Sequence, residues 1–364
     1  MTITHAEEYR EPQLVAPLIE RIRRRSRKPV RLMEVCGTHT VSIFRSGIRS
    51  LLPETITLLS GPGCPVCVTA QRDIDACIAL AAMPGVMLTT FGDLMRVPGS
   101  HGSLRQEKAA GHDIRIVYSA MDALELAAEN PDRNVVFIGI GFETTAPTVA
   151  AAIAVANQRN IRNFLVYSVH KTVPQALEAL VNDPETRIDG FLLPGHVSVI
   201  TGLAAYRPFV SRHAIPCVVA GFEPADILLA IAMLIDQMED GRAALENAYP
   251  RAVTEAGNAK AKALMQQVFE PVDAIWRGLG QIPASGLGFR GPYRNHDAAE
   301  ALRPDPGNVQ EPAACACGDV LKGIKTPLDC PLFGTACTPM HPVGPCMVSS
   351  EGTCAAYFRY HPRT

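Results

Sequence analysis

Three cysteines near the start of the chain lie in short loops whose composition suits thiolate chemistry. Cys64 and Cys67 form a CxxC pair in the run GPGCPVC, and Cys36 begins the run CGTHT. A CxxC pair can bind a soft metal ion or cycle between a dithiol and a disulfide. Zinc needs four ligands, and the sequence has no second CxxC to complete a zinc ribbon. Three thiolates in one cleft would form an electron-rich metal site.

His39 and Glu143 are the candidates for handling protons. His39 lies three residues after Cys36 and offers a proton donor or a metal ligand, although a structural hydrogen bond is an equal alternative. Glu143 lies in the apolar loop GFETT, where a buried carboxyl has a raised pKa or caps a helix. The loop begins like a dinucleotide-binding loop but lacks its third glycine, and no P-loop motif occurs, so nucleotide binding has little support.

A second group of cysteines lies near the end of the chain. Its members are Cys315, Cys317, Cys330, Cys337, Cys346 and Cys354. Their spacing matches neither the bacterial ferredoxin run nor a zinc ribbon. The segment has too little aliphatic content for a core of its own, so a metal must hold it together. Its chemistry alone leaves a [4Fe-4S] cluster and a structural zinc ion equally open.

The composition limits the class of protein. The 364 residues predict two or three domains, and 47% hydrophobic with 19% charged residues is typical of a globular chain. A net charge of −2 gives no electrostatic basis for binding nucleic acid. The longest apolar run is far short of the roughly 20 residues of a membrane span. The N-terminus MTITHAEEYR lacks the apolar stretch of a secretory signal. Clustered cysteines without an export signal predict a cytoplasmic protein with metal or redox chemistry.

The elements that must position these groups follow a βαβα order. Continuous Val/Ile/Leu runs predict strands that are buried on both faces, at residues 30–35, 56–60, 86–90, 114–118, 135–140, 164–168, 190–193 and 217–220. Helices are predicted between them, at residues 71–82, 121–130, 147–157 and 173–182. The order predicts an α/β fold with open parallel sheets. Residues 225–275 indicate helix, and residues 280–314, which are rich in Gly and Pro, indicate loop.

A weak internal repeat predicts two similar α/β domains and a third domain. The first spans residues 30–131 with the CGTHT and GPGCPVC loops, and the second spans residues 132–225 with the GFETT and PGHVS loops. Residues 1–29 with 226–364 form a third, helical and loop-rich domain. Ligands bind beyond the carboxyl ends of strands in such sheets. We therefore expect the four loops to converge on one cleft.

Five long motifs resemble the HypD family of hydrogenase maturation proteins. They are MEVCGTHT (33–40), GPGCPVCVT (61–69), GFETTAPTVA (141–150), PGHVSVITG (194–202) and the tail CPLFGTACTP…CMVSSEGTCAAYFRY (330–360). The resemblance covers residues 30 to 360 and keeps the motifs in order. It implies two similar α/β domains and a third domain that carries an iron–sulfur cluster within residues 315–356.

The resemblance implies an assembly scaffold with redox activity rather than a classical turnover enzyme. Together with a HypC-like chaperone, such a scaffold holds the iron on which the Fe(CN)2CO group of [NiFe]-hydrogenase is built. A HypE-like protein donates the cyanides, and a hydrogenase large-subunit precursor receives the finished group.

The resemblance also implies a role for each cysteine. Cys36, Cys64 and Cys67 are associated with the iron under construction. The ligands of the [4Fe-4S] cluster are implied to be Cys317, Cys330, Cys337 and Cys354, with Cys346 as an alternative to one of them. The cluster is expected to relay electrons to the Cys64/Cys67 pair or to the iron. His39 and Glu143 are expected to manage protons or to hydrogen-bond the cyanide nitrogens.

Two alternatives remain open. An iron–sulfur-dependent thiol–disulfide oxidoreductase explains the Cys64/Cys67 pair and a cluster, but it does not explain Cys36. An α/β protein with a structural zinc tail explains the fold alone.

Overall fold

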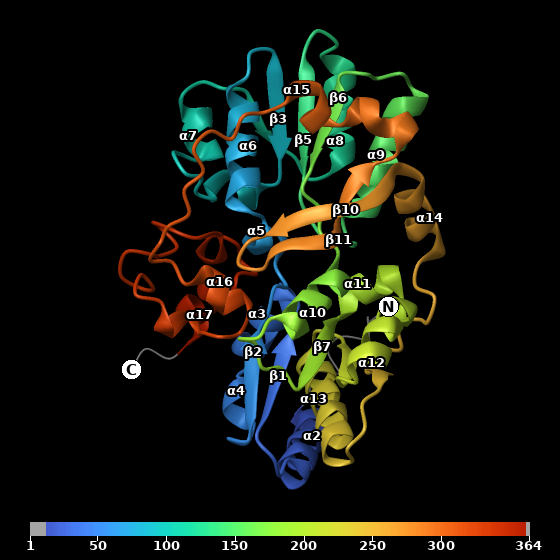
Figure 1. Ribbon diagram of the computed structural model, residues 1–364, viewed down its shortest axis with the longest axis vertical. Coiled ribbons are helices and arrows are strands. Elements are labelled where there is room, and N and C mark those ends of the chain that lie inside the picture. The colour runs from blue at the N-terminus through green and yellow to red at the C-terminus, as the bar shows by residue number, and fades with distance from the viewer. Residues whose placement is uncertain (1–11, 362–364) are drawn as a thin grey trace.

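The computed structural model describes residues 12–361 and contains two parallel β-sheets (Figure 1). The first sheet has the order β2-β1-β7-β8-β9, and all its strand pairs are parallel. Its strands are β1 (Val30–Glu34), β2 (Ile56–Ser60), β7 (Gly190–Pro194), β8 (Cys217–Ala220) and β9 (Leu245–Asn247). We call it the first sheet because the chain enters it first.

The second sheet has the order β4-β3-β5-β6 and is also parallel. Its strands are β3 (Val86–Thr90), β4 (Ile114–Ile116), β5 (Asn134–Gly139) and β6 (Phe164–Ser168). Every residue of β3 is buried, as a strand covered on both faces requires. The predicted α/β class with two open parallel sheets is confirmed, and all eight predicted strands are present.

Helices cover both sheets, and the four that the sequence predicted are present. The helices that precede or belong to the sheets are α2 (Pro12–Arg25), α3 (Gly37–Arg45), α4 (Ile48–Leu51), α5 (Pro65–Val68), α6 (Gln71–Ala82), α7 (Leu104–Ala109), α8 (Ala120–Glu129), α9 (Ala146–Gln158), α10 (Val173–Asn182), α11 (Gly195–Thr201), α12 (Arg207–His213) and α13 (Pro224–Glu239). Those that follow are α14 (Ala259–Val268), α15 (Ala298–Leu302), α16 (Cys317–Leu321) and α17 (Thr353–Tyr360). Among residues 12–361, no helix combines the length and the apolar character that crossing a bilayer requires.

The sheets do not follow the predicted division of the chain at residues 131 and 132. β1 and β2 pair with β7 and β8 in one sheet, while β3 to β6 form the other. The chain therefore leaves the first sheet after β2, builds the whole second sheet, and returns. The predicted third domain also differs, because α2 and α13 pack together on the first sheet. Residues 1–11 lie outside the described part of the chain.

Three strands lie where the sequence indicated helix or loop. β9 follows α13, and the antiparallel hairpin β10 (Phe269–Trp276) and β11 (Gly280–Phe289) follows α14. β11 has the sequence GQIPASGLGF, whose glycines and proline mimic a loop. β11 is a strand because it pairs with β10 and packs against α10. Neither contact can be deduced from the local sequence.

The hairpin lies across the middle of the molecule, between the two sheets (Figure 1). Its Trp276 is buried, stacks on Phe142 with ring centroids 6.0 Å apart, and donates from Nε1 to Ser285. Arg277 donates its backbone N–H to the Val68 carbonyl at 2.8 Å. The hairpin therefore fixes the end of the CxxC loop.

The cysteine-rich C-terminal segment, residues 315–361, packs beside both sheets (Figure 1). Its last helix, α17, lies on α3, and Tyr357 meets Phe44 edge-on with ring centroids 4.5 Å apart. At Gly37 an added Cβ would come 2.5 Å from the Glu351 Cβ, so glycine permits this close approach. The segment thus rests directly on the loop that begins with Cys36.

Candidate metal and thiol site

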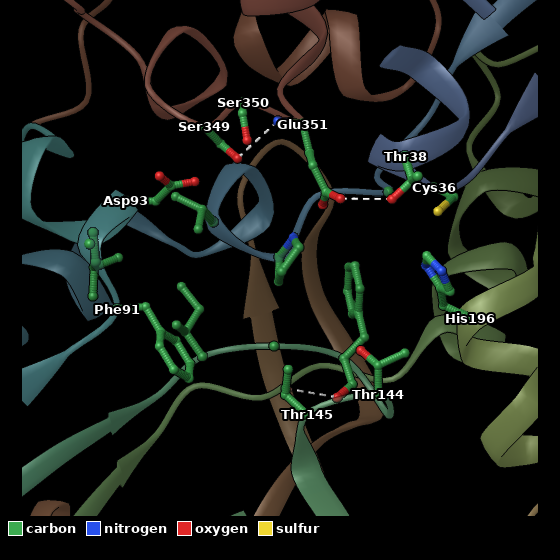
Figure 2. A pocket seen from close by; sticks show the side chains of 18 of the residues that line it. Cys36, Thr38, Phe91, Asp93, Thr144, Thr145, His196, Ser349, Ser350 and Glu351 are labelled. Atoms are coloured by element: carbon green, nitrogen blue, oxygen red, sulfur yellow. Dashed lines mark hydrogen bonds between the residues drawn. The ribbon is translucent and has the colours of Figure 1, made fainter. Parts of the chain in front are cut away.

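A cleft of about 710 Å³ lies between the two sheets (Figure 2). Residues from all four predicted loops line it: Cys36 and Thr38, Gly63 and Pro65, Gly141, Phe142, Thr144 and Thr145, and His196. The predicted convergence of these loops is confirmed. Its physical basis is that the carboxyl ends of the parallel strands in both sheets face one another.

The cleft is also lined by residues for which the sequence predicted no role. Phe91 to Leu94 follow β3, and Ile116 ends β4 and is followed by Val117 and Tyr118, while Ser349, Ser350 and Glu351 come from the C-terminal segment. Figure 2 shows Glu351 beside Thr38 and Cys36, with Phe91 and Asp93 across the cavity. The run SSEG carries no local signal of this placement, because only tertiary packing brings it to the cleft.

Cys36 is the N-cap residue of α3 and lines the cleft. Its backbone N–H donates to Glu34 Oε2 at 3.1 Å, and Thr38 Oγ1 donates to Glu351 Oε1 at 2.7 Å. Burial raises the pKa of the Cys36 thiol to about 12, and the backbone N–H of His39 opposes this rise. The thiol is therefore protonated at neutral pH unless a cation or a metal ion binds it.

The buried Glu34 ends strand β1 directly beside this loop. Desolvation raises its pKa to about 7, against the opposing hydrogen bonds from Thr40 and the Cys36 backbone. A glutamate between the apolar residues Met33 and Val35, at the end of the strand, was the available sequence signal for its role. Glu34 holds the Cys36 loop by its side chain.

The loops of Cys36 and Cys64 are in backbone contact. Gly37 donates to the Gly63 carbonyl at 2.9 Å, and a Cβ at Gly63 would lie 2.2 Å from the Cys36 nitrogen. The CxxC thiols are not part of the cleft lining: Cys64 Sγ accepts from the Cys67 N–H at 3.3 Å, and the Cys67 thiol interacts with the side chains of both Cys64 and Cys346. The structure therefore joins the two loops but directs Cys67 toward the C-terminal segment.

His39 is fully buried behind the Cys36 loop and is not part of the cleft lining. Its Nε2 donates to the Gly221 carbonyl at 2.8 Å, and its Nδ1 has no hydrogen-bond partner among the described residues. Burial lowers its pKa to about 4, so the imidazole is neutral at pH 7. His196 instead lines the cleft and stacks on Phe222 with ring centroids 3.8 Å apart.

Glu143 is buried behind its loop, whose neighbours Phe142 and Thr144 line the cleft. Its Oε1 accepts from the Val173 N–H at 3.0 Å, at the start of α10, and its Oε2 has no partner within residues 12–361. Desolvation raises its pKa to about 7. The geometry matches the helix-capping alternative for this residue.

All six cysteines of the C-terminal segment line one small, apolar cavity. The Cys354 side chain interacts electrostatically with all five other cysteines of the cavity. The sulfurs of Cys317 and Cys346 are 3.0 Å apart. Cys317 also contacts Cys315 through its side chain.

The sulfurs of Cys67, Cys346 and Cys317 thus form a continuous series from the CxxC loop to the cavity. Burial raises the pKa of the Cys67 thiol well above its usual value. No three His, Cys, Asp or Glu side chains within residues 12–361 converge on one point, as the ligands of a single metal ion do. A cubane cluster needs no such convergence, because each cysteine binds a different iron atom.

Comparison with known proteins gives consistent matches over nearly the whole chain. Residues 13–361 match the HypD family model, described as the hydrogenase formation hypA family. A Rhodobacter capsulatus protein named hydrogenase maturation factor HypD is 48% identical, over 98% of this chain and 97% of its own. The protein of the same name from Escherichia coli (strain K12) is 47% identical, over 97% of each chain. A putative hydrogenase expression/formation protein of Methanocaldococcus jannaschii is 44% identical, over 95% of this chain and 97% of its own.

Proposed function

Because the chain belongs to the HypD family of hydrogenase maturation factors, we propose that it is the scaffold on which the Fe(CN)2CO group of [NiFe]-hydrogenase is assembled. In this proposal a HypC-like chaperone binds at the cleft and shares the iron. A HypE-like protein delivers the cyanides, and a hydrogenase large-subunit precursor receives the finished group. The iron with its diatomic ligands is cargo, held only until transfer.

The observation that carries the proposal is the position of Cys36. It is a thiol at the lining of a 710 Å³ cleft, with the Glu351 carboxylate beside it and His196 on the same wall. A thiolate is a strong donor and a suitable ligand for low-spin iron. Because the pKa of the free thiol is about 12, iron binding must displace its proton, and Glu351 is placed to receive it.

Unlike Cys36, neither Cys64 nor Cys67 lines the cleft. Their predicted share in binding the iron stays a prediction, whereas the contact from Cys67 to Cys346 supports a redox role for the pair. We propose that Cys67, Cys346 and Cys317 exchange electrons and protons as dithiols and disulfides. Neutral, buried thiols at hydrogen-bond distance are suited to this exchange once a thiolate forms.

The donor set of the C-terminal cavity fits a [4Fe-4S] cluster. Four of the six cysteines that line the cavity, namely Cys315, Cys330, Cys337 and Cys354, would provide the thiolates that such a cluster requires. This proposal exchanges Cys317 for Cys315 in the predicted ligand set, because the Cys317 thiol is engaged with Cys346. When bound, the cluster would supply electrons, one at a time, to a disulfide formed by the adjoining cysteines.

Infrared spectroscopy on the anaerobically co-purified complex with a HypC-like protein tests the scaffold function. The wild-type complex should show the cyanide and carbonyl stretches of the iron group, and Cys36→Ala should lose them. The control is Cys77→Ala, since Cys77 is buried in α6 away from the cleft lining. Full-intensity bands in the Cys36→Ala complex would contradict the proposal.

The thiol–disulfide oxidoreductase remains a second candidate, because the series Cys67, Cys346 and Cys317 is what such an enzyme needs. Catalytic turnover of a dithiol substrate by the isolated chain would favour it. Stoichiometric iron with cyanide and carbonyl bands would favour the scaffold. Metal analysis of anaerobically purified protein separates both from a structural zinc tail.

A further inference from the structure

A second groove, of about 440 Å³, lies between the cysteine-rich segment and the turn that follows β3. Arg96, from the 3-10 turn Gly92–Arg96 after β3, forms one part of it. Arg359 and Phe358 of α17 form another, and Met347 forms the floor toward the segment. The groove adjoins the cleft, because Asp93 and Ser350 line both.

Met347 separates this groove from the sulfurs. Its side chain lines both the groove and the six-cysteine cavity, and the residue is 2% exposed. Phe358 of the groove meets Phe333 of the cavity with ring centroids 6.2 Å apart. A single layer of side chains therefore lies between the groove and the cysteines. Electron transfer weakens steeply with distance, and a redox partner docked in this groove would lie only one layer of side chains from the sulfurs.

The charged side chains that line the groove determine which surface charge a partner should carry. Arg96 and Arg359 are exposed, and neither forms an ion pair with any residue of the described range 12–361. Arg96 donates to the Val348 carbonyl at 3.3 Å, and the Arg359 guanidinium lies 5.8 Å from the Tyr360 ring. The exposed carboxylate of Asp93 offsets one of the two positive charges. The groove therefore carries a net positive charge that an acidic surface would complement.

An exposed apolar side chain stands at the edge of the groove. Met340 is 83% exposed and follows Pro339, which lines the groove. Small, transient electron-transfer interfaces combine a few apolar contacts with charge steering. The exposed Met340 beside a groove that contains Arg96 and Arg359 provides this combination.

We propose that this groove is the docking surface for an acidic, low-potential one-electron carrier protein that reduces the cysteine-rich segment. The inference rests on the proposed redox role of the segment. In each encounter the carrier is oxidised by one electron and the segment gains that electron. Two such transfers, with two protons from solvent, convert one disulfide of the Cys67, Cys346 and Cys317 series into two thiols.

The test compares two reductants on the intact, cluster-loaded protein. A reduced plant-type [2Fe-2S] ferredoxin serves as the acidic carrier, and dithionite serves as a reductant that needs no docking surface. Stopped-flow absorbance follows reduction of the segment in the wild type and in Arg96→Glu/Arg359→Glu. The matched control is Arg24→Glu, an exposed arginine of α2 outside the groove.

The double charge reversal should slow reduction by ferredoxin at least about tenfold at low salt, with the difference shrinking as salt screens the charges. Reduction by dithionite should be unchanged, and Arg24→Glu should behave as the wild type. An unchanged ferredoxin rate in the double variant, or no ferredoxin reaction in a wild type that dithionite reduces, would overturn the docking surface alone. A wild type that dithionite cannot reduce would overturn the redox role and the docking surface together.

Discussion

The Sγ atom of Cys317 lies 3.0 Å from the Sγ atom of Cys346. Both cysteines are free thiols, and a disulfide bond of about 2.05 Å would need only a small further approach. Cys346 also contacts Cys67, so it can pair with either neighbour. Cys346 therefore lies between the Cys67 side chain of the CxxC loop and Cys317 of the cysteine-rich segment.

Mild oxidation should therefore link Cys346 before it links the isolated thiols. We expect a disulfide from Cys346 to Cys317 or to Cys67, found by alkylation and peptide mass spectrometry. Cys346→Ser should remove both products, and Cys77→Ser should leave them in place, because Cys77 lies within α6. Recovery of the Cys64–Cys67 disulfide alone would contradict this order.

Gly63→Ala should disturb the Cys36 loop. The added Cβ would lie 2.2 to 2.6 Å from the Cys36 backbone, and that backbone cannot move without breaking the bond from Gly37 to Gly63. Overpacking of this kind costs about 1–3 kcal/mol of unfolding free energy, which urea denaturation measures. Gly291→Ala is the control, since its Cβ would meet no atom within 4 Å. Equal stability of the two variants would show that the loops are not held together.

Glu143→Gln should change how stability depends on pH. The pKa of Glu143 is about 7 in the folded protein, above its ordinary value of 4.5, so the folded state keeps a proton that the unfolded state releases. This contribution is full below pH 4.5 and is lost as pH rises through about 7. As the pH rises from 5 to 8, the free energy of unfolding of the variant should thus increase by up to about 3 kcal/mol relative to that of the wild type.

The measurement for Glu143 is urea unfolding at pH 5, 6, 7 and 8. Glu125→Gln is the control, because its side chain is 56% exposed and pairs only at the surface with Arg159. A parallel pH profile for Glu143→Gln and the wild type would mean that the carboxyl is not desolvated in solution.

Arg251→Met should be strongly destabilising. The Arg251 guanidinium donates to both oxygens of Asp226, at 2.7 and 2.6 Å, and the Asp226 side chain is 1% exposed. Removing the cation leaves a buried, uncompensated carboxylate, which costs about 3–5 kcal/mol. Arg207→Met provides the comparison, because its pair with Glu255 is exposed and is worth at most about 1 kcal/mol. Similar thermal midpoints for the two variants would refute this difference.

The buried strands and the loops that follow them could be predicted because their signals are local. Val/Ile/Leu runs such as those of β5 and β7 define parallel strands, and CGTHT or GPGCPVC must then lie at their carboxyl ends. The cleft followed from this rule, before any pairing was known.

The order of the strands could not be predicted, because runs buried on both faces carry no mark of their partners. From their sequences, β2 and β3 are as suited to pair with each other as with any other strand. They nevertheless belong to different sheets. The place of Glu351 in the cleft and the proximity of Cys346 to Cys67 could not be predicted for a similar reason. Only the packing of the C-terminal segment on α3 and on the CxxC loop places these two residues beside Cys36 and Cys67.

The return of the chain to the first sheet has a consequence for how the protein forms during synthesis. β1 leaves the ribosome long before its partner β7, whose Gly190 pairs with Leu32. The second sheet emerges complete in the interval, so it can fold as a unit while β1 still has an open edge. Parallel pairing between strands that are far apart in the chain is slow. Until it forms, the unpaired edge of β1 is prone to aggregation. Nascent chains halted just before β7 should therefore depend on chaperones more than chains halted after β8.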